Sequence, residues 1–170
     1  RQRGEAYRDA MADLYDRLPY LAYSSEFICC HAGAPTMKYS REDLIDLDRK
    51  PKLRRQLTNL RMRKTGAPDG YGPGDVRRLR KRLGVAEDTP FIVGHTPLSN
   101  KDSLWMNVGG IANHHVLYGS NPKRIGVLTR PDQELLPLIY PAEPLLPILN
   151  RMLQTPLNAP SEPDPHSGQD

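Results

Sequence analysis

Two stretches of this chain, FICCHAG at residues 27–33 and FIVGHTP at residues 91–97, share one design. Each begins with a short apolar run, which is typical of a buried strand. Each then reaches a histidine, His31 or His95, beside a glycine in a tight turn. Ligands and metals in layered α/β folds bind at the carboxyl ends of strands, so the pattern predicts two strands that present histidines at a sheet edge.

Upstream and between these stretches, the pattern predicts mainly helices. Apolar residues at helical spacing favour a helix over 7–19, which Pro19 ends. Extended runs are expected at 20–23 and 27–30, and Ser40 with Asp43 three residues later is typical of a capped helix start. Residues 51–63 are expected to be partly helical and 65–74 to be loop. A basic helix is predicted to begin at Asp75, to run to Leu83 and to end at Gly84.

After His95 the pattern becomes β-rich. Strands are predicted at 103–108, 115–118, 124–129 and 135–140. A helix is expected around 143–153, and the Pro/Ser/Asp-rich residues 156–170 are expected to form a disordered tail. The elements predict a layered fold that combines helices and sheet (α/β, of the α+β type), and residues 1–155 are expected to form part of one domain.

Composition fits an ordinary soluble protein of 170 residues, with 38% hydrophobic and 26% charged residues. No apolar run approaches the roughly 18–20 residues of a membrane span. Cys29 and Cys30 are adjacent, and a disulfide between strand neighbours would be strained, so both are expected to be core residues in a reducing compartment. We therefore expect a cytoplasmic location.

Charge is unevenly distributed. Residues 49–82 carry a net charge of +11, whereas the remainder carries −7. A block this basic can attract phosphate esters, polyphosphate, nucleic acid or an acidic protein surface. It can equally be a solvated helix face.

The two histidine stretches, 64 residues apart, resemble the fourth and fifth motifs of calcineurin-like metallophosphoesterases, which read HAG and GHTP here. The similarity is to the branch that contains phosphoprotein phosphatases and bacterial symmetrical diadenosine tetraphosphatases. Pro97 stands where the wider superfamily has a second histidine, which favours this branch. The helix that ends in Leu18-Pro19 and the β-rich region also match, so the resemblance covers about residues 5–130.

The resemblance implies the C-terminal half of a four-layer α/β/β/α sandwich whose N-terminal half is absent. It implies a hydrolase with two divalent metal ions (Mn, Fe or Zn) about 3.5–4 Å apart, with His31 and His95 on one ion. It also places an arginine, Arg61 or Arg63, on the substrate phosphate. The remaining ligands and the catalytic residues belong to motifs that this chain lacks before His31, so no catalytic residue is expected here and the chain alone should be inactive.

The implied substrates are a phosphoprotein, a dinucleoside polyphosphate or a small phosphomonoester. His114 and His115 alternate along a strand and are interpreted as structural, with substrate contact as the other possibility. The alternative function is a non-catalytic basic module for an acidic partner or nucleic acid. Nucleic acid is disfavoured because aromatic residues, which provide stacking platforms, make up only 6% of the chain.

Overall fold

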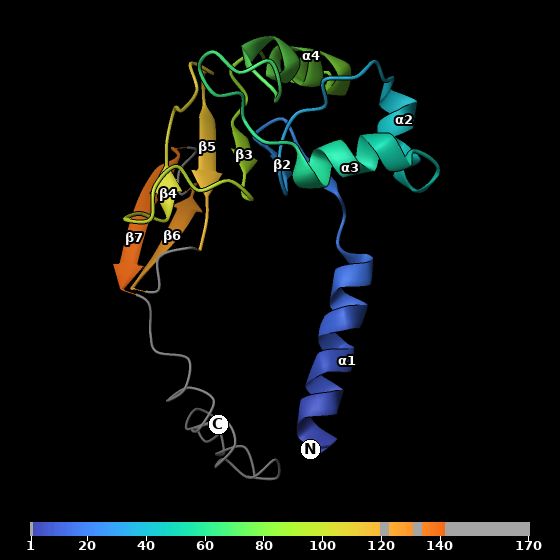
Figure 1. Cartoon of the computed structure of the whole chain (residues 1–170), viewed down its shortest axis with the longest axis vertical. Helices are drawn as coiled ribbons and strands as arrows, with labels where there is room; N and C mark the ends of the chain where they lie inside the picture. The colour runs from blue at the N-terminus through green and yellow to red at the C-terminus, as the bar shows by residue number, and fades with distance from the viewer. Residues whose placement is uncertain (1, 120–122, 131–133, 142–170) are drawn as a thin grey trace, which may run out of the picture.

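The computed structural model describes residues 2–119, 123–130 and 134–141 (Figure 1). The helix expected at 143–153 and the tail expected at 156–170 lie outside this part of the chain. In the described part the protein has an α+β fold, which combines a five-stranded mixed sheet, a two-stranded sheet and helices.

The five-stranded sheet has the order β1-β2-β3-β5-β4. Its centre is parallel: β2 (Ile28–Cys30) pairs with β3 (Phe91–Val93), and β3 pairs with β5 (His114–Leu117). Both edges are antiparallel and are formed by β1 (Leu21–Tyr23) and β4 (Leu104–Trp105). In the β2–β3 register Cys30 lies opposite Val93, so both strands end at the same level.

Helices cover one face of this sheet. They are α2 (Arg41–Ile45), the 3-10 helix η1 (Leu47–Arg49), α3 (Pro51–Asn59) and α4 (Pro73–Leu83). Alternate strand residues face them and form one buried core with the apolar sides of α3 and α4: Ile28, Cys30, Phe91 and Val93 with Leu53, Leu57, Val76 and Leu79. The apolar residues that alternate along the strands therefore pack against the apolar residues at helical spacing in α4, and together they form one hydrophobic layer.

Two elements lie outside this layer. Helix α1 (Gln2–Arg17) extends away from the sheet, and its Tyr7, Leu14 and Tyr15 are exposed (Figure 1). The hairpin of β6 (Arg124–Thr129) and β7 (Leu136–Pro141) forms the second sheet beside β4. No helix in the described residues is long and apolar enough to cross a membrane.

Most element predictions are confirmed, and the strands of the two histidine stretches and β6 agree closely with the sequence pattern. The capping box is also present: Ser40 Oγ accepts a hydrogen bond from the Asp43 N–H, and Asp43 accepts one from the Ser40 N–H. Gly84 ends α4 with a left-handed φ of 72°. Cys29 and Cys30 are both free.

Several predicted boundaries were wrong. Helix α1 spans Gln2–Arg17 rather than 7–19, and β7 spans Leu136–Pro141 rather than 135–140. The strand expected at 103–108 is only Leu104–Trp105, because Asn107 adopts a left-handed φ of 53°, which breaks extended structure. The next strand starts at His114 rather than His115. Helix α4 starts at Pro73, and Asp75 lies in its first turn, where its carboxylate accepts the Gly72 N–H.

Candidate functional site

His31 and His95 meet at the carboxyl ends of β2 and β3. Each follows its strand by one or two residues, so parallel pairing brings them to the same sheet edge. His31 Nε2 lies 3.1 Å from His95 Nδ1, and the ring centroids are 5.0 Å apart with an interplanar angle of 64°. His31 is exposed and His95 is half-buried, so this pair faces solvent.

The backbone around His95 forms an unusual turn. His95 has a φ of 64°, and the Thr96 N–H donates to the Gly94 carbonyl at 2.7 Å, which closes a three-residue turn. A left-handed conformation costs a non-glycine residue free energy and is concentrated at functional sites. Gly94 also donates its N–H to the His31 carbonyl at 2.9 Å, which ties the two strand ends together.

Gly94 allows this close approach. A Cβ there would lie 3.2 Å from the Leu117 carbonyl oxygen and 3.3 Å from that of His31, both of which belong to the backbone. A side chain at this position would therefore push neighbouring strand ends apart. The close packing of these strand ends therefore explains why a residue without a side chain occupies position 94.

The environment of His95 favours its neutral form. Burial lowers the pKa of His95, and the nearby His31 and Arg61 lower it further. A neutral imidazole has a lone pair on one nitrogen, which is the state that binds metal ions. In the 3.1 Å contact one ring nitrogen donates and the other accepts.

The pair is suited to a shared cation. Two bonds of about 2.1 Å from nitrogens 3.1 Å apart meet at an angle of about 95°, which suits neighbouring positions of an octahedral ion. The described residues contain no group of three or more histidines, cysteines or carboxylates that could hold a metal ion. Within the described residues the histidine pair could therefore offer two nitrogen donors but no complete coordination sphere.

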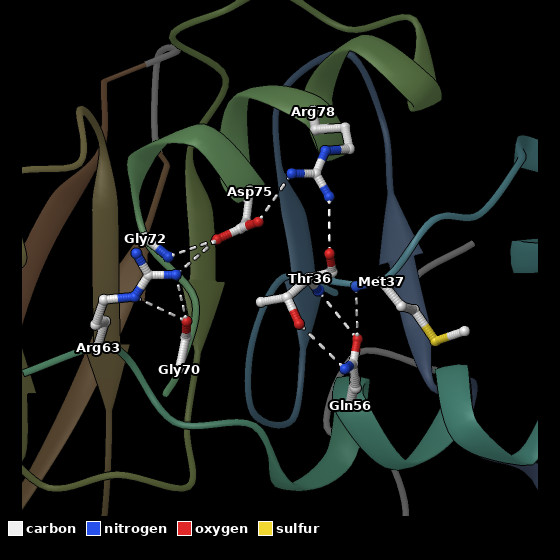
Figure 2. A network of polar contacts seen from close by, with 8 residues as sticks. All are labelled: Thr36, Met37, Gln56, Arg63, Gly70, Gly72, Asp75 and Arg78. Carbon is white, nitrogen blue, oxygen red and sulfur yellow. Dashed lines mark hydrogen bonds and ion pairs between the residues drawn. The ribbon is translucent and has the colours of Figure 1, made fainter. Parts of the chain in front are cut away.

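Arg61 and Arg63 differ sharply in their surroundings. The Arg63 guanidinium donates from Nε and Nη2 to the Gly70 carbonyl at 3.2 and 3.0 Å, and its Nη2 lies 3.9 Å from Asp75 Oδ2 (Figure 2). Arg61 is exposed and close enough for its charge to lower the pKa of His95. Arg63 is thus held in the loop, whereas the charge of Arg61 acts on His95.

Tyr71 holds the segment that carries both arginines. Its N–H donates to the Arg61 carbonyl at 3.1 Å, and its carbonyl accepts the Arg63 N–H at 2.8 Å. The ring is buried against Gly33, where any Cβ would overlap it. Tyr71 therefore links the turn after β2 to the arginine segment. Sequence reasoning missed it, although a lone aromatic between Gly70 and Gly72 in a polar loop is an available signal.

His114 completes this link from β5. Its Nδ1 lies 3.0 Å from the Val108 carbonyl, which can only accept, so Nδ1 carries the proton. Its Nε2 then accepts the Tyr71 hydroxyl at 3.0 Å. Burial is the main reason that the pKa of His114 is lowered to about 4. His114 is therefore uncharged at neutral pH.

We predict that His114 makes stability depend on pH. In the unfolded chain His114 has the ordinary histidine pKa of about 6.5, whereas in the folded state its pKa is about 4. The unfolded state therefore binds a proton at this residue more readily. The free energy of unfolding should fall by up to roughly 3 kcal/mol as the pH drops through this window, and the contribution is fully present above it. Urea unfolding at pH 7 and pH 4.5 measures the loss. His114→Gln should show a smaller difference between the two pH values, and an equal difference would contradict the assignment.

Other polar residues serve the fold rather than the histidine pair. Arg80, one of the basic residues of α4, is buried and donates to the carbonyls of Thr89 at 2.9 Å and Ala112 at 2.6 Å. His115 is buried, and its ring nitrogens have no hydrogen-bond partner among the residues that the structure describes. It pairs with Ile92 in the middle of β3, away from the strand end that carries His95.

Comparison with known proteins adds no assignment. No protein-family model matches the chain, and no curated protein shows significant similarity to it.

Proposed function

We propose that this chain forms part of a metal-dependent phosphoesterase, in which His31 and His95 bind one divalent ion of a dinuclear centre. The observation that carries the proposal is the 3.1 Å approach of His31 Nε2 to His95 Nδ1 at adjacent parallel strand ends. On this proposal the mixed sheet and its helices are one half of the four-layer sandwich that the sequence resemblance implies. The described residues contain no group of three or more histidines, cysteines or carboxylates, so on this proposal the remaining ligands would lie outside them.

The chemistry proposed for the chain's own residues is binding and orientation. A divalent ion polarises a phosphate oxygen and lowers the pKa of bound water. His31 and His95 would hold that ion through neutral imidazole nitrogens, and the low pKa of His95 limits competition from protons. Manganese, iron and zinc all accept imidazole with oxygen ligands.

Arg61 would bind the substrate phosphate beside this ion. A guanidinium can donate two parallel hydrogen bonds to phosphate oxygens, and of the two candidates Arg61 is the one whose charge lowers the pKa of His95. Arg63 is already bound to the Gly70 carbonyl. Arg61 and Arg63, which the sequence alone leaves equivalent, would therefore have different roles.

Paramagnetic NMR tests the metal assignment. Titration of the ¹⁵N-labelled chain with Mn²⁺ should broaden the ring signals of His31 and His95 first. His114 and His115 lie on β5, which pairs with β3, and their ring signals should broaden less at low Mn²⁺ because the paramagnetic effect falls steeply with distance. Broadening of His114 or His115 before His31 and His95, or no broadening of His31 and His95, would refute the proposed ligand pair.

Phosphate binding tests the arginine assignment. In the presence of Mn²⁺, Arg61→Gln should weaken binding of inorganic phosphate by at least about tenfold, because a charge-assisted hydrogen bond contributes roughly 1.5–3 kcal/mol. Arg63→Gln removes the same charge and should leave phosphate affinity within about twofold. Isothermal titration calorimetry on both variants measures the contrast, and the reverse order would assign the role to Arg63.

A further inference from the structure

A hollow of about 550 Å³ lies between the start of α2 and the last turns of α4. Its lining residues are Ser40, Arg41, Glu42, Arg78, Lys81 and Arg82. Four of these side chains are cationic and one is a carboxylate. We call this set of residues the basic hollow. Its net positive charge favours an anionic ligand.

Two cations of the basic hollow are held in place by the fold. Arg78 donates from Nη1 to the Thr36 carbonyl and from Nη2 to Asp75 Oδ1, both at 3.1 Å (Figure 2). Arg41 Nη2 donates to the Tyr23 hydroxyl at 3.0 Å. These bonds orient the guanidinium groups before any ligand arrives, which reduces the entropy lost on binding.

The other two cations have no such partners. Lys81 and Arg82 are exposed on adjacent positions of α4, and neither makes a hydrogen bond or ion pair with a residue that the structure describes. Glu42 is the one carboxylate in the lining. Glu42 in the lining and Asp75 beside Arg78 offset two of the four cations, so the hollow keeps a net positive charge that a bound polyanion would offset.

The composition of the lining narrows the class of ligand. Three of the four cations are arginines, whose planar forks match two phosphate oxygens at once. The lining has no aromatic and no aliphatic residue, so it offers neither a platform for base stacking nor a pocket for an apolar side chain. Recognition would rest on charge and on hydrogen bonds to phosphate.

We propose that the basic hollow is a binding site for an oligophosphate chain of two or more linked phosphate groups. It is separate from the histidine pair. Arg41 bonds to Tyr23, which pairs with Ile28 at the start of β2, whereas His31 follows the end of that strand. The site thus goes beyond the proposed function and requires no metal ion.

Calorimetric titration of the whole chain with sodium tripolyphosphate in the presence of EDTA tests this site. Lys81→Gln/Arg82→Gln should weaken binding at least tenfold. Lys52→Gln/Arg55→Gln is the matched control, because it removes the same charge from exposed positions of α3 outside the hollow. It should change affinity by less than threefold, and Glu42→Gln should strengthen binding. Circular dichroism checks that each variant keeps its fold.

Several results would overturn the proposal. Equal weakening by both double variants would show general attraction to a basic protein, and absence of binding by the unaltered chain would exclude the site. A glutamate-rich peptide that binds as tightly as tripolyphosphate would exclude phosphate recognition. Equal binding of tripolyphosphate and ATP supports the site, whereas binding of ATP alone would place recognition on the nucleoside. His31→Ala/His95→Ala should bind tripolyphosphate normally, so failure of the metal proposal leaves this result unaffected.

Discussion

Replacing His95 with alanine is expected to weaken Zn²⁺ binding by about 100-fold. Loss of groups that merely support a metal ligand lowers affinity by roughly 10–100-fold, so loss of a ligand itself should reach the upper end. Zn²⁺ is the better probe here because imidazole binds it more tightly than Mn²⁺. Competition against a chromophoric chelator at pH 7.5 measures the affinity.

The double variant gives a sharper test of a shared ion. If His31 and His95 bind one cation together, His31→Ala should cost as much as His95→Ala. His31→Ala/His95→Ala should then be little worse than either single variant, because one imidazole alone holds the ion poorly. Losses that add fully would indicate two independent weak sites. An unchanged affinity in His95→Ala would exclude it as a ligand.

Gly33→Ala is expected to lower the free energy of unfolding by about 3 kcal/mol, at the upper end of overpacking effects. A Cβ at Gly33 would overlap the Tyr71 ring and lie 2.8 Å from the Leu60 carbonyl oxygen. The ring cannot withdraw easily, because its hydroxyl bonds to His114 and the ring packs edge-to-face with Phe91, with centroids 6.1 Å apart. Urea unfolding of the purified variant measures the change.

Gly74→Ala is the matched control for that substitution. A Cβ at Gly74 meets no atom within 4 Å, and the residue lies in the first turn of α4. Alanine favours helix over glycine, so stability should stay equal or rise by less than about 1 kcal/mol. Similar losses in the two variants would contradict a specific contact between Gly33 and Tyr71.

Local patterns in the sequence predicted the elements that present the site. An apolar run followed by a histidine and a turn identified β2 and β3, and the Ser40–Asp43 pair identified the start of α2. These features depend on residues within a few positions of each other. The predicted end of the strand that contains β4 was wrong because it depends on one backbone angle, the left-handed φ of Asn107.

The basic block shows what composition cannot resolve. Along the sequence, Arg78, Arg80 and Arg82 are equivalent members of one charged helix. In the fold, Arg80 is buried on backbone carbonyls, Arg78 is held by Asp75, and Arg82 is exposed in the basic hollow. The orientation of α4 about its own axis relative to the sheet gives the three arginines these different surroundings, because it determines which side chains face the core.

The sequence by itself determined that two strands end in histidines and that a charged helix precedes the second. Only the tertiary structure decided that β2 and β3 pair in parallel, and this places His31 Nε2 and His95 Nδ1 3.1 Å apart. It also decided that Arg63 is held by Gly70, whereas the charge of Arg61 acts on His95 and lowers its pKa. The physical reason is range: strand and turn formation depend on neighbouring residues, whereas side-chain convergence requires pairing between strands that lie about sixty residues apart in the chain.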